Sequence, residues 1–231
     1  MKRLAIIPAR GGSKRIPGKN IKDFLGKPII AYSIETAAAS GLFDEIMVST
    51  DDETIADTAR KYGAVVPFMR SAEASDDFAT TADVLREVLS KYAGQGHDIE
   101  EACCIYATAP LMNGERLGEA LGKMHAGGYD CAFPVVQFSY PPQRGLVIRN
   151  GKVSRNDPKH AMTRSQDLEP IYHDAGQFYF FKVDSFAARN TLISTNSCAI
   201  VLPELEVQDL DNLTDWALAE MKYKLMSAEC E

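Results

Sequence analysis

Short apolar runs alternate with helical segments along the first 136 residues, and this alternation constrains the fold more than any other feature. The runs end near glycine, proline or polar residues and lie at 4–7, 46–49, 64–68, 102–106 and 131–136. Between them, apolar residues recur at helical spacing at 28–40, 53–62, 81–92 and 114–125. Strands joined by helices of this length pair in parallel. The sequence therefore predicts an α/β fold with a mostly parallel, Rossmann-like sheet and helices on both faces.

The alternation stops after Gln137, where we expect an inserted arm at about 139–176. The arm lacks a helical period, and residues 146–153 predict a β-hairpin because Asn150-Gly151 suits a type I′ turn. Strands at 177–183 and 198–202 and an amphipathic helix at 214–226 would complete a single domain of residues 1–231. Because an exposed hairpin favours contact with another chain, the arm predicts a homodimer.

A Gly-rich loop rich in basic residues follows the first strand. The first thirty residues hold eight of the chain's 25 Lys and Arg against one acidic residue, whereas the rest hold 17 against 31. The loop cations are Arg10, Lys14, Arg15 and Lys19. Gly11, Gly12 and Gly18 permit close backbone approach to an oxygen-rich ligand. The spacing matches neither a Walker loop nor G-x-G-x-x-G. The loop predicts a site for a small polyanion, with a solvated basic turn as the alternative.

Charge and composition exclude several classes of protein. The net charge of −7 opposes binding to duplex nucleic acid. The five cysteines include no C-x-x-C pair, so neither a disulfide framework nor a zinc knuckle is indicated. The N-terminal apolar stretch is too short for a signal peptide, and no run approaches the roughly 18 residues that cross a bilayer. We therefore expect a cytoplasmic protein that binds neither nucleic acid nor membranes.

Two pairs of carboxylates are candidates for a metal site. In an extended segment, Asp209 and Asp211 would share one face while Leu210 turns into the core. Mg²⁺ commonly bridges carboxylates and substrate phosphates, so a phosphate-binding loop supports this site, although such pairs also arise by chance in acidic chains. At Asp51-Asp52 the adjacent side chains would point apart, and Asp52 is better explained as the start of a helix.

Four segments together resemble the acylneuraminate cytidylyltransferases, which make CMP-sugar acids from CTP. They are the loop at 7–20, Leu-Gly-Lys-Pro-Ile at 25–29, Ser-Thr-Asp at 49–51 and Asp-Leu-Asp at 209–211. The segments 106–111, 164–168 and 172–179 are similar to those of the pseudaminic acid branch. Tyr106 stands where enzymes for N-acetylneuraminate typically carry glutamine. The resemblance covers nearly the whole chain and implies a nucleotidyltransferase sheet with a dimerisation arm.

The resemblance implies roles for the basic loop and the acidic pair. Arg10 and Lys19 would hold the triphosphate of CTP and stabilise the leaving pyrophosphate. Other loop residues would contribute to binding, namely Ala9, Gly11, Lys14, Arg15 and Asn20. Asp209 and Asp211 would hold Mg²⁺ as the cofactor. Asp211 is also the implied candidate for a general base, and activation of the sugar hydroxyl by the metal alone is the alternative.

Further residues are implied to bind the nucleobase and the sugar. Arg70, Ala79 and Thr81 would lie near cytosine, although Thr81 is explained equally well as a helix start. Arg164 on the arm would bind the sugar carboxylate, reaching across a dimer interface. The wall of the sugar pocket would include Tyr106, Gln166, His173 and Phe178. For His173, a structural role beside Asp174 is the alternative.

The expected reaction is the transfer of CMP from CTP to the anomeric hydroxyl of a nonulosonic acid. The resemblance favours pseudaminic acid, with N-acetylneuraminate and legionaminic acid as alternatives, and implies a use in flagellin or surface-polysaccharide glycosylation. A rival is an NDP-hexose or molybdopterin-type nucleotidyltransferase, which usually has a different loop. A non-catalytic nucleotide sensor is a third class, in which one member of the Asp-x-Asp pair would be expected to be missing.

Overall fold

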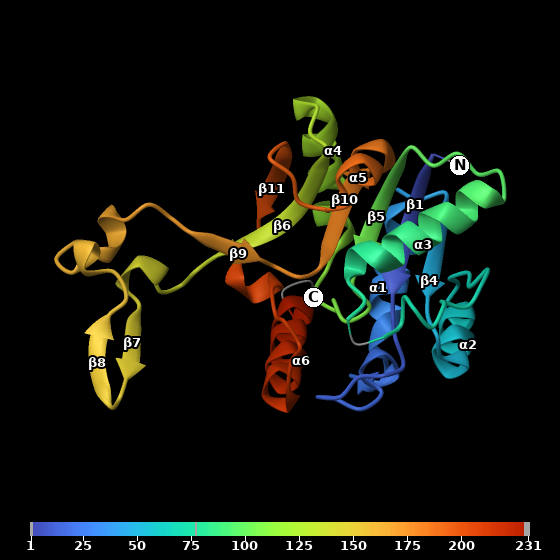
Figure 1. The fold of residues 1–231 in the computed structure, drawn as a ribbon. Helices are drawn as coiled ribbons and strands as arrows, with labels where there is room; N and C mark the ends of the chain where they lie inside the picture. The colour runs from blue at the N-terminus through green and yellow to red at the C-terminus, as the bar shows by residue number, and fades with distance from the viewer. Residues whose placement is uncertain (1, 77, 229–231) are drawn as a thin grey trace.

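A central β-sheet organises the computed structural model, which describes residues 2–76 and 78–228 (Figure 1). Its strands are β1 (Arg3–Pro8), β4 (Glu45–Ser49), β5 (Glu101–Ile105), β6 (Cys131–Gln137), β9 (Tyr172–Asp174), β10 (Phe178–Lys182) and β11 (Ser197–Val201). They are ordered β11-β6-β10-β5-β1-β4, and β9 pairs with β6 outside this path. β1 is parallel to β4 and β5, and β6 is parallel to β11. The predicted mostly parallel sheet is therefore confirmed.

The strand β10 departs from the parallel pattern. It lies between β5 and β6 and is antiparallel to both. The short strand β9, also antiparallel to β6, precedes it, and Gly176 between the two has a φ of 64°. The sequence predicts a strand here but not its place, because that place depends on where the chain returns from the arm.

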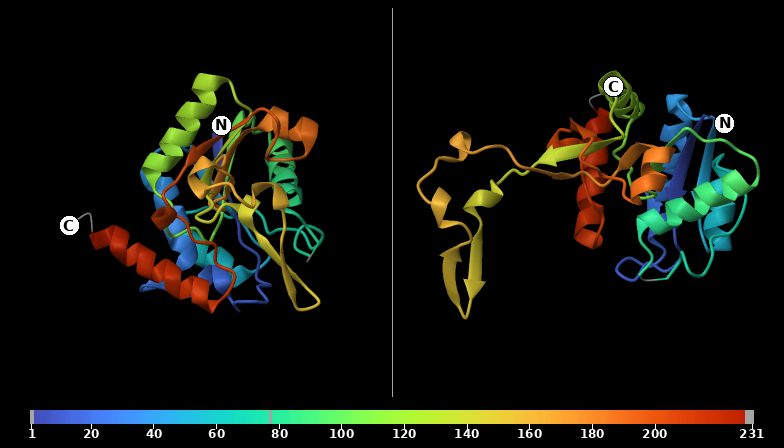
Figure 2. Two further views of the ribbon diagram at one scale, coloured as in Figure 1. Left: turned by 90° about the vertical axis from the view of Figure 1, so that its left-hand side faces the viewer. Right: turned by 45° about the horizontal axis from the view of Figure 1, so that its top comes forward.

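Helices cover both faces of the sheet, as predicted (Figure 2). They are α1 (Ile29–Ser40), α2 (Glu53–Lys61), α3 (Thr81–Gly94), α4 (Gly114–Gly127), α5 (Val183–Arg189) and α6 (Leu213–Ala228). Neighbouring side chains of β1 point to opposite faces and enter two cores. Ala5 and Ile7 pack in the core that includes α1, α2 and α4, whereas Leu4 and Ile6 pack in the core that includes α3 and α5.

Two segments differ from the expected elements. At 64–68, where a strand is predicted, Val65 forms only an isolated parallel bridge with Met47. Pro67 follows closely and has no backbone N–H with which to continue a ladder. The helix α5 follows β10 directly where no helix is predicted. By contrast, Asp52 begins α2 as predicted, because its carboxylate accepts hydrogen bonds from the backbone nitrogens of Thr54 and Ile55.

An arm leaves the sheet after β6 and returns at β9 (Figure 1). It carries the antiparallel hairpin of β7 (Leu146–Arg149) and β8 (Lys152–Arg155). Asn150 and Gly151 have φ values of 52° and 74°, as a type I′ turn requires. The predicted hairpin is confirmed. Short 3₁₀ turns lie at η2 (Pro142–Arg144), η3 (Pro158–His160) and η4 (Ser165–Asp167). Large apolar side chains are exposed on the arm, namely Tyr140, Leu146, Ile148, Val153 and Met162.

A third, smaller hydrophobic cluster joins two distant parts of the chain. It packs Ile16 from the basic loop and Phe24 against Leu210 and Trp216. Phe24 lies in a two-residue strand, β2 (Asp23–Phe24), which pairs with β3 (Lys27–Pro28). Its ring meets that of Trp216 edge to face, with 5.6 Å between centroids. Burial of these side chains brings the basic loop next to the acidic pair.

Four of the five cysteines lie within the described residues. Cys103, Cys104, Cys131 and Cys198 are buried and unpaired. Cys230 lies outside the described residues. Over residues 2–76 and 78–228, we find no helix with the length and apolar character needed to cross a membrane.

Candidate active site

The basic loop leaves the carboxyl end of β1 and is held by its own contacts. Asn20, in the 3₁₀ helix η1 (Lys19–Ile21), donates from Nδ2 to the carbonyl of Arg10 at 2.9 Å. Gly18 precedes η1 with a left-handed φ of 61°, which favours glycine. The backbone nitrogen of Gly11 donates to Oδ1 of Asp51 at 3.0 Å. These bonds fix the loop over the ends of β1 and β4.

Gly11 is required by a contact within the protein. A Cβ atom at this position would lie 2.8 Å from Oδ2 of Asp52, whereas a Cβ at Gly12 would meet no atom within 4 Å. The sequence suggests that Gly11 allows a ligand to approach the backbone, but in the structure the group that approaches Gly11 is the carboxylate of Asp52. It also gives Asp51 a part in shaping the loop, which the sequence analysis missed.

A cleft of about 550 Å³ opens beside the loop. It gathers residues from the loop, from the segment before α3 and from the end of β5. Of the predicted residues, it is lined by Arg10, Lys14, Arg15, Lys19, Asn20, Arg70, Ala79, Thr81 and Tyr106. Thr80 lines it as part of the turn at 79–81, and Ser13, Asp76 and Thr108 also line it but were not predicted as site residues. Asp76 is the one acidic residue among the described lining residues, so the cleft is cationic in an acidic chain.

Asp209 and Asp211 lie next to the basic loop. Leu210 between them is 1% exposed and packs in the third cluster, so the two carboxylates are turned out of the core. Oδ2 of Asp211 forms an ion pair with Nη1 of Arg15 at 2.6 Å. Nζ of Lys19 donates to the carbonyl of Leu210 at 2.8 Å, although the two residues are 191 positions apart.

The two carboxylates suit a Mg²⁺ ion whose remaining ligands are water and the oxygens of a bound phosphate. Among the described residues, no three His, Cys, Asp or Glu side chains are grouped so that they could hold a metal ion. Mg²⁺ keeps several waters and commonly takes one or two carboxylates together with substrate phosphates. Asp209 and Asp211 supply two carboxylates, and the cationic cleft beside them has room for a ligand that carries phosphates.

Lys19 has a shifted pKa. Burial lowers the pKa of its ammonium group below the ordinary 10.5. Asp209 and Asp211 act in the opposite direction, while Arg15 and Arg10 add to the lowering. A polyanion bound beside Lys19 would favour the ammonium form, so binding and protonation of this side chain are linked.

Arg70 and the start of α3 form the opposite wall of the cleft. Arg70 is 8% exposed, and its Nε donates to Oγ of Ser49 at 3.0 Å. Burial lowers the pKa of Arg70. Thr80 caps α3 in a capping box with Asp83, and Thr81 is the first residue of the helix. Thr81 thus both starts the helix and lines the cleft, so the two interpretations of this residue are compatible.

Tyr106 closes the cleft at the end of β5. Its ring packs against that of Tyr179, with 5.6 Å between centroids, and burial raises the pKa of its hydroxyl. Tyr179 in turn donates to Oδ2 of Asp174 at 2.6 Å. The backbone nitrogen of Tyr106 donates to the carbonyl of Gln177 at 2.8 Å. Tyr106 therefore forms part of the cleft wall and is supported there by Tyr179.

Comparison with known proteins identifies the family of this chain. The family model described as cytidylyltransferase matches residues 4–216. The chain belongs to the cytidylyltransferase family. The predicted family and the predicted class of enzyme are both confirmed.

Named relatives of this cytidylyltransferase act on sugar acids. This chain is 45% identical over 226 residues to the pseudaminic acid cytidylyltransferase of Campylobacter jejuni, and the match covers 97% of each chain. It is 32% identical over 234 residues to the CMP-N,N'-diacetyllegionaminic acid synthase of Legionella pneumophila, again covering 97% of each. The solved structure of CMP:2-keto-3-deoxy-manno-octonic acid synthetase complexed with CTP shares the fold, with a TM-score of 0.69 and 20% identity over 99% of this chain and all of the other.

Three residues predicted to bind the sugar lie on or beside the arm of this cytidylyltransferase, outside the cleft. Arg164 forms an exposed ion pair with Asp167, 2.7 Å from Nε to Oδ2, and Gln166 lies in the following turn η4. His173 is on β9 at the root of the arm, and its ring is 4.7 Å from that of Phe138. Contact of Arg164 with a sugar bound to a second copy stays a prediction, as does a place for Gln166 and His173 in the wall of the sugar pocket.

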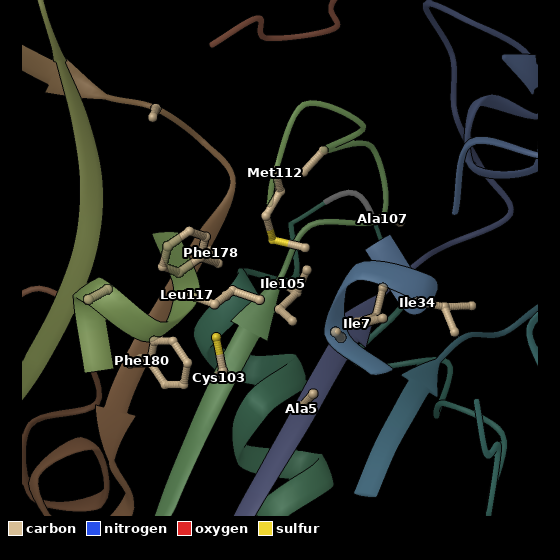
Figure 3. Packing of buried hydrophobic residues seen from close by; sticks show 14 of the residues in the cluster. Ala5, Ile7, Ile34, Cys103, Ile105, Ala107, Met112, Leu117, Phe178 and Phe180 are labelled. Atoms are coloured by element: carbon tan, nitrogen blue, oxygen red, sulfur yellow. The ribbon is translucent and has the colours of Figure 1, made fainter. Parts of the chain in front are cut away.

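The prediction that Phe178 lines the sugar pocket is wrong. Its side chain is 0% exposed and packs against Phe180, among core residues that include Leu117 and Ile105 (Figure 3). Alternation along β10 turns Phe178 to the face covered by α4 and turns Tyr179 towards Tyr106.

Ala9, which was predicted to contribute to binding, also places its side chain in the core. Ala9 is 1% exposed, and its backbone nitrogen donates to the carbonyl of Ser49 at 2.9 Å. Neither its methyl group nor its N–H is therefore available to a ligand.

Proposed function

We propose that this cytidylyltransferase transfers CMP from CTP to the anomeric hydroxyl of a nonulosonic acid, preferring pseudaminic acid, and releases pyrophosphate. The observation that carries the proposal is the cationic cleft beside Asp209 and Asp211. A triphosphate supplies the negative charge that such a cleft attracts. The 45% identity to the Campylobacter enzyme over nearly the full length supports the choice of sugar.

The loop residues would bind and orient the triphosphate. In the reaction, the anomeric oxygen forms a bond to the α-phosphorus, and the bond from that phosphorus to pyrophosphate breaks. Negative charge grows on the pyrophosphate, and Arg10 and Lys19 would stabilise it. Lys14, Arg15 and Asn20 line the same part of the cleft and would complete the cradle. The proton of the hydroxyl leaves to a base, for which Asp211 is the candidate.

Mg²⁺ is the proposed cofactor, held by Asp209 and Asp211. When bound, it would supply Lewis-acid stabilisation of the phosphate oxygens. The ion pair from Arg15 to Asp211 and the hydrogen bond from Lys19 to Leu210 would keep this pair facing the triphosphate. The chain's own contacts thus set the distance between the carboxylates and the cations.

The nucleobase would lie against Arg70, Ala79 and Thr81. Cytosine carries an amino donor where uracil carries a carbonyl, so a backbone carbonyl in this wall would distinguish the two. Tyr106 would separate the nucleotide from the sugar. Arg164 and Gln166 would reach the sugar from a second copy, in a homodimer built through the arm. The exposed apolar side chains of the hairpin and of α6 support this assembly.

A legionaminic or N-acetylneuraminic acid is the alternative substrate, which the Legionella relative supports. Pyrophosphate release with CTP should be measured against pseudaminic, legionaminic and N-acetylneuraminic acids. We expect kcat/KM to be highest for pseudaminic acid, by about 10-fold or more. No turnover with any of the three would overturn the proposed reaction, and a higher value for another sugar would overturn only the proposed preference.

A further inference from the structure

The segment that carries the acidic pair to the edge of the basic loop has little regular structure of its own. Between β11 and α6 it forms only the short 3₁₀ helix η5 (Glu204–Glu206). Such a segment depends on other parts of the protein to satisfy its backbone carbonyls and fix its path. Four of these carbonyls, from residue 204 to residue 210, accept hydrogen bonds from side chains of other elements.

Lys222 provides two of these bonds. Its Nζ donates to the carbonyl of Glu204 at 2.9 Å and to the carbonyl of Val207 at 2.6 Å. Because Lys222 belongs to α6, which begins just after Asp211, it ties the incoming segment to the helix that follows. Lys222 is partly buried, and that burial lowers the pKa of its ammonium group. Lys224, two residues later on the same helix, is exposed.

Gln177 ties the same segment to the sheet and to the cleft wall. Its side-chain Nε2 donates to the carbonyl of Glu206 at 2.6 Å, and its backbone carbonyl accepts from the backbone nitrogen of Tyr106. The side chain is 4% exposed, which limits it to this arrangement. Lys19 completes the set through its bond to the carbonyl of Leu210.

Arg116 holds the segment through the side chain of Glu206. Its Nε and Nη2 each lie 2.9 Å from an oxygen of the Glu206 carboxylate, in a two-pronged ion pair. Planar pairing of this kind holds both groups in one orientation. Side chains from α4, from α6 and from the residue before β10 therefore converge on the segment that leads to Asp209.

We propose that Lys222, Gln177 and Arg116 are positioning residues, which hold the segment 204–210 so that Asp209 and Asp211 meet the metal-bound triphosphate already ordered. This inference rests on the proposed function for the role of the acidic pair. We call these three residues the clamp. Without the clamp, the segment would have to become ordered when the ligand binds, and the free-energy cost of that ordering would lower the affinity for the metal.

Lys222→Met tests the clamp, with Lys224→Met as the matched control on the same helix. In the metal-free protein, we expect Lys222→Met to speed hydrogen exchange of the amides at 205–212, while Lys224→Met leaves it unchanged. In CTP turnover, we expect Lys222→Met to raise the half-saturating Mg²⁺ concentration by about 10-fold to 100-fold, with the rate largely recovered at high Mg²⁺.

The outcomes separate the clamp from the proposed reaction. Unchanged exchange at 205–212 in Lys222→Met would overturn the clamp, as would an unchanged Mg²⁺ requirement in an active enzyme. If the wild-type enzyme turns over no CTP, the proposed function fails, and hydrogen exchange still decides whether the clamp orders the segment. If Lys222→Met does not fold, Glu206→Gln carries the same test, because it keeps the size of the side chain and weakens the pair with Arg116.

Discussion

Gly11 shapes the basic loop, Arg10 and Lys19 line the cleft that it borders, and Asn20 does both. These roles follow from the contacts of each residue, because Gly11 packs against Asp52 and Asn20 donates to the carbonyl of Arg10. The sequence shows that cations and glycines alternate in the loop, but it does not show which glycine is tightly packed. The close approach to Asp52 that demands Gly11 arises only when the ends of β1 and β4 lie side by side.

Gly11→Ala should disrupt the loop, and Gly12→Ala should not. The added methyl group at position 11 would push Asp52 from its capping position on α2, where loss of a cap costs about 1 kcal/mol. We expect a lower midpoint in thermal unfolding and reduced CTP turnover for Gly11→Ala alone. Equal effects of the two substitutions would contradict this account of Gly11.

Arg10→Ala should impair catalysis without unfolding the protein. Loss of one donor to developing charge typically lowers turnover by about 10²-fold to 10³-fold. Pyrophosphate release measures the rate, and circular dichroism checks the fold. Arg60→Ala is a suitable control, because Arg60 is a charged residue of α2 paired with Asp57 outside the cleft. An unchanged rate in Arg10→Ala would make the loop a solvated basic turn.

CTP affinity should fall at alkaline pH as Lys19 loses its proton. The free protein lowers the pKa of Lys19 below 10.5, and a bound triphosphate favours the charged form. Affinity is therefore retained below the lowered pKa and lost as the pH rises through it. Calorimetry with CTP from pH 7.5 upward measures this loss. Lys19→Arg, whose charge persists, should show a flatter profile, and identical profiles would argue against Lys19 as the titrating group.

At the scale of elements, local signals predicted well and distant contacts did not. The turn at Asn150-Gly151 and the cap at Asp52 depend on neighbouring residues, so the sequence is sufficient to predict them. The face of β10 on which Phe178 lies depends on the return path of the arm, which no local pattern encodes. The strand expected at 64–68 is cut short by Pro67 after one bridge.

The arm should hold two copies of the chain together. Ile148 is 74% exposed on β7, opposite Val153 on β8, and an isolated protein gains nothing from exposing this pair. We expect light scattering to give twice the chain mass for the wild type and the single mass for Ile148→Asp. Arg149→Ser, a change in a neighbouring polar residue, should stay dimeric. A strictly monomeric wild type at micromolar concentration would refute the dimer.

At the scale of the whole molecule, the candidate site depends on contact between the basic loop and the segment that carries the acidic pair. Chemistry alone predicts that a basic loop and an acidic pair act on one phosphate ligand. The structure supplies the mechanical reason, because Ile16 and Leu210 pack in one cluster. That contact could not be read from the sequence, since each side chain is an ordinary apolar residue in a short, irregular segment.

The third cluster should unfold together with the main core. Trp216 is the chain's one tryptophan and lies in this cluster, so its fluorescence reports on the cluster. The helix α1 contributes Ile29 and Tyr32 to the cluster and Ile30 and Ile34 to the main core, which couples the two. We expect unfolding curves from fluorescence and far-UV circular dichroism to coincide. An earlier fluorescence transition would show that the cluster melts separately.

The position of β10 also sets an order of events during synthesis on the ribosome. The strands β1, β4 and β5 emerge early and can pair with one another, but β5 and β6 meet only through β10. The whole arm, from 138 to 171, must be translated before β10 appears, which takes about 2–7 s at roughly 5–20 residues per second. During that interval one edge of β5 lacks its partner, and unpaired strand edges are where nascent chains associate wrongly. The arm therefore sets the length of the period in which this protein most needs a chaperone.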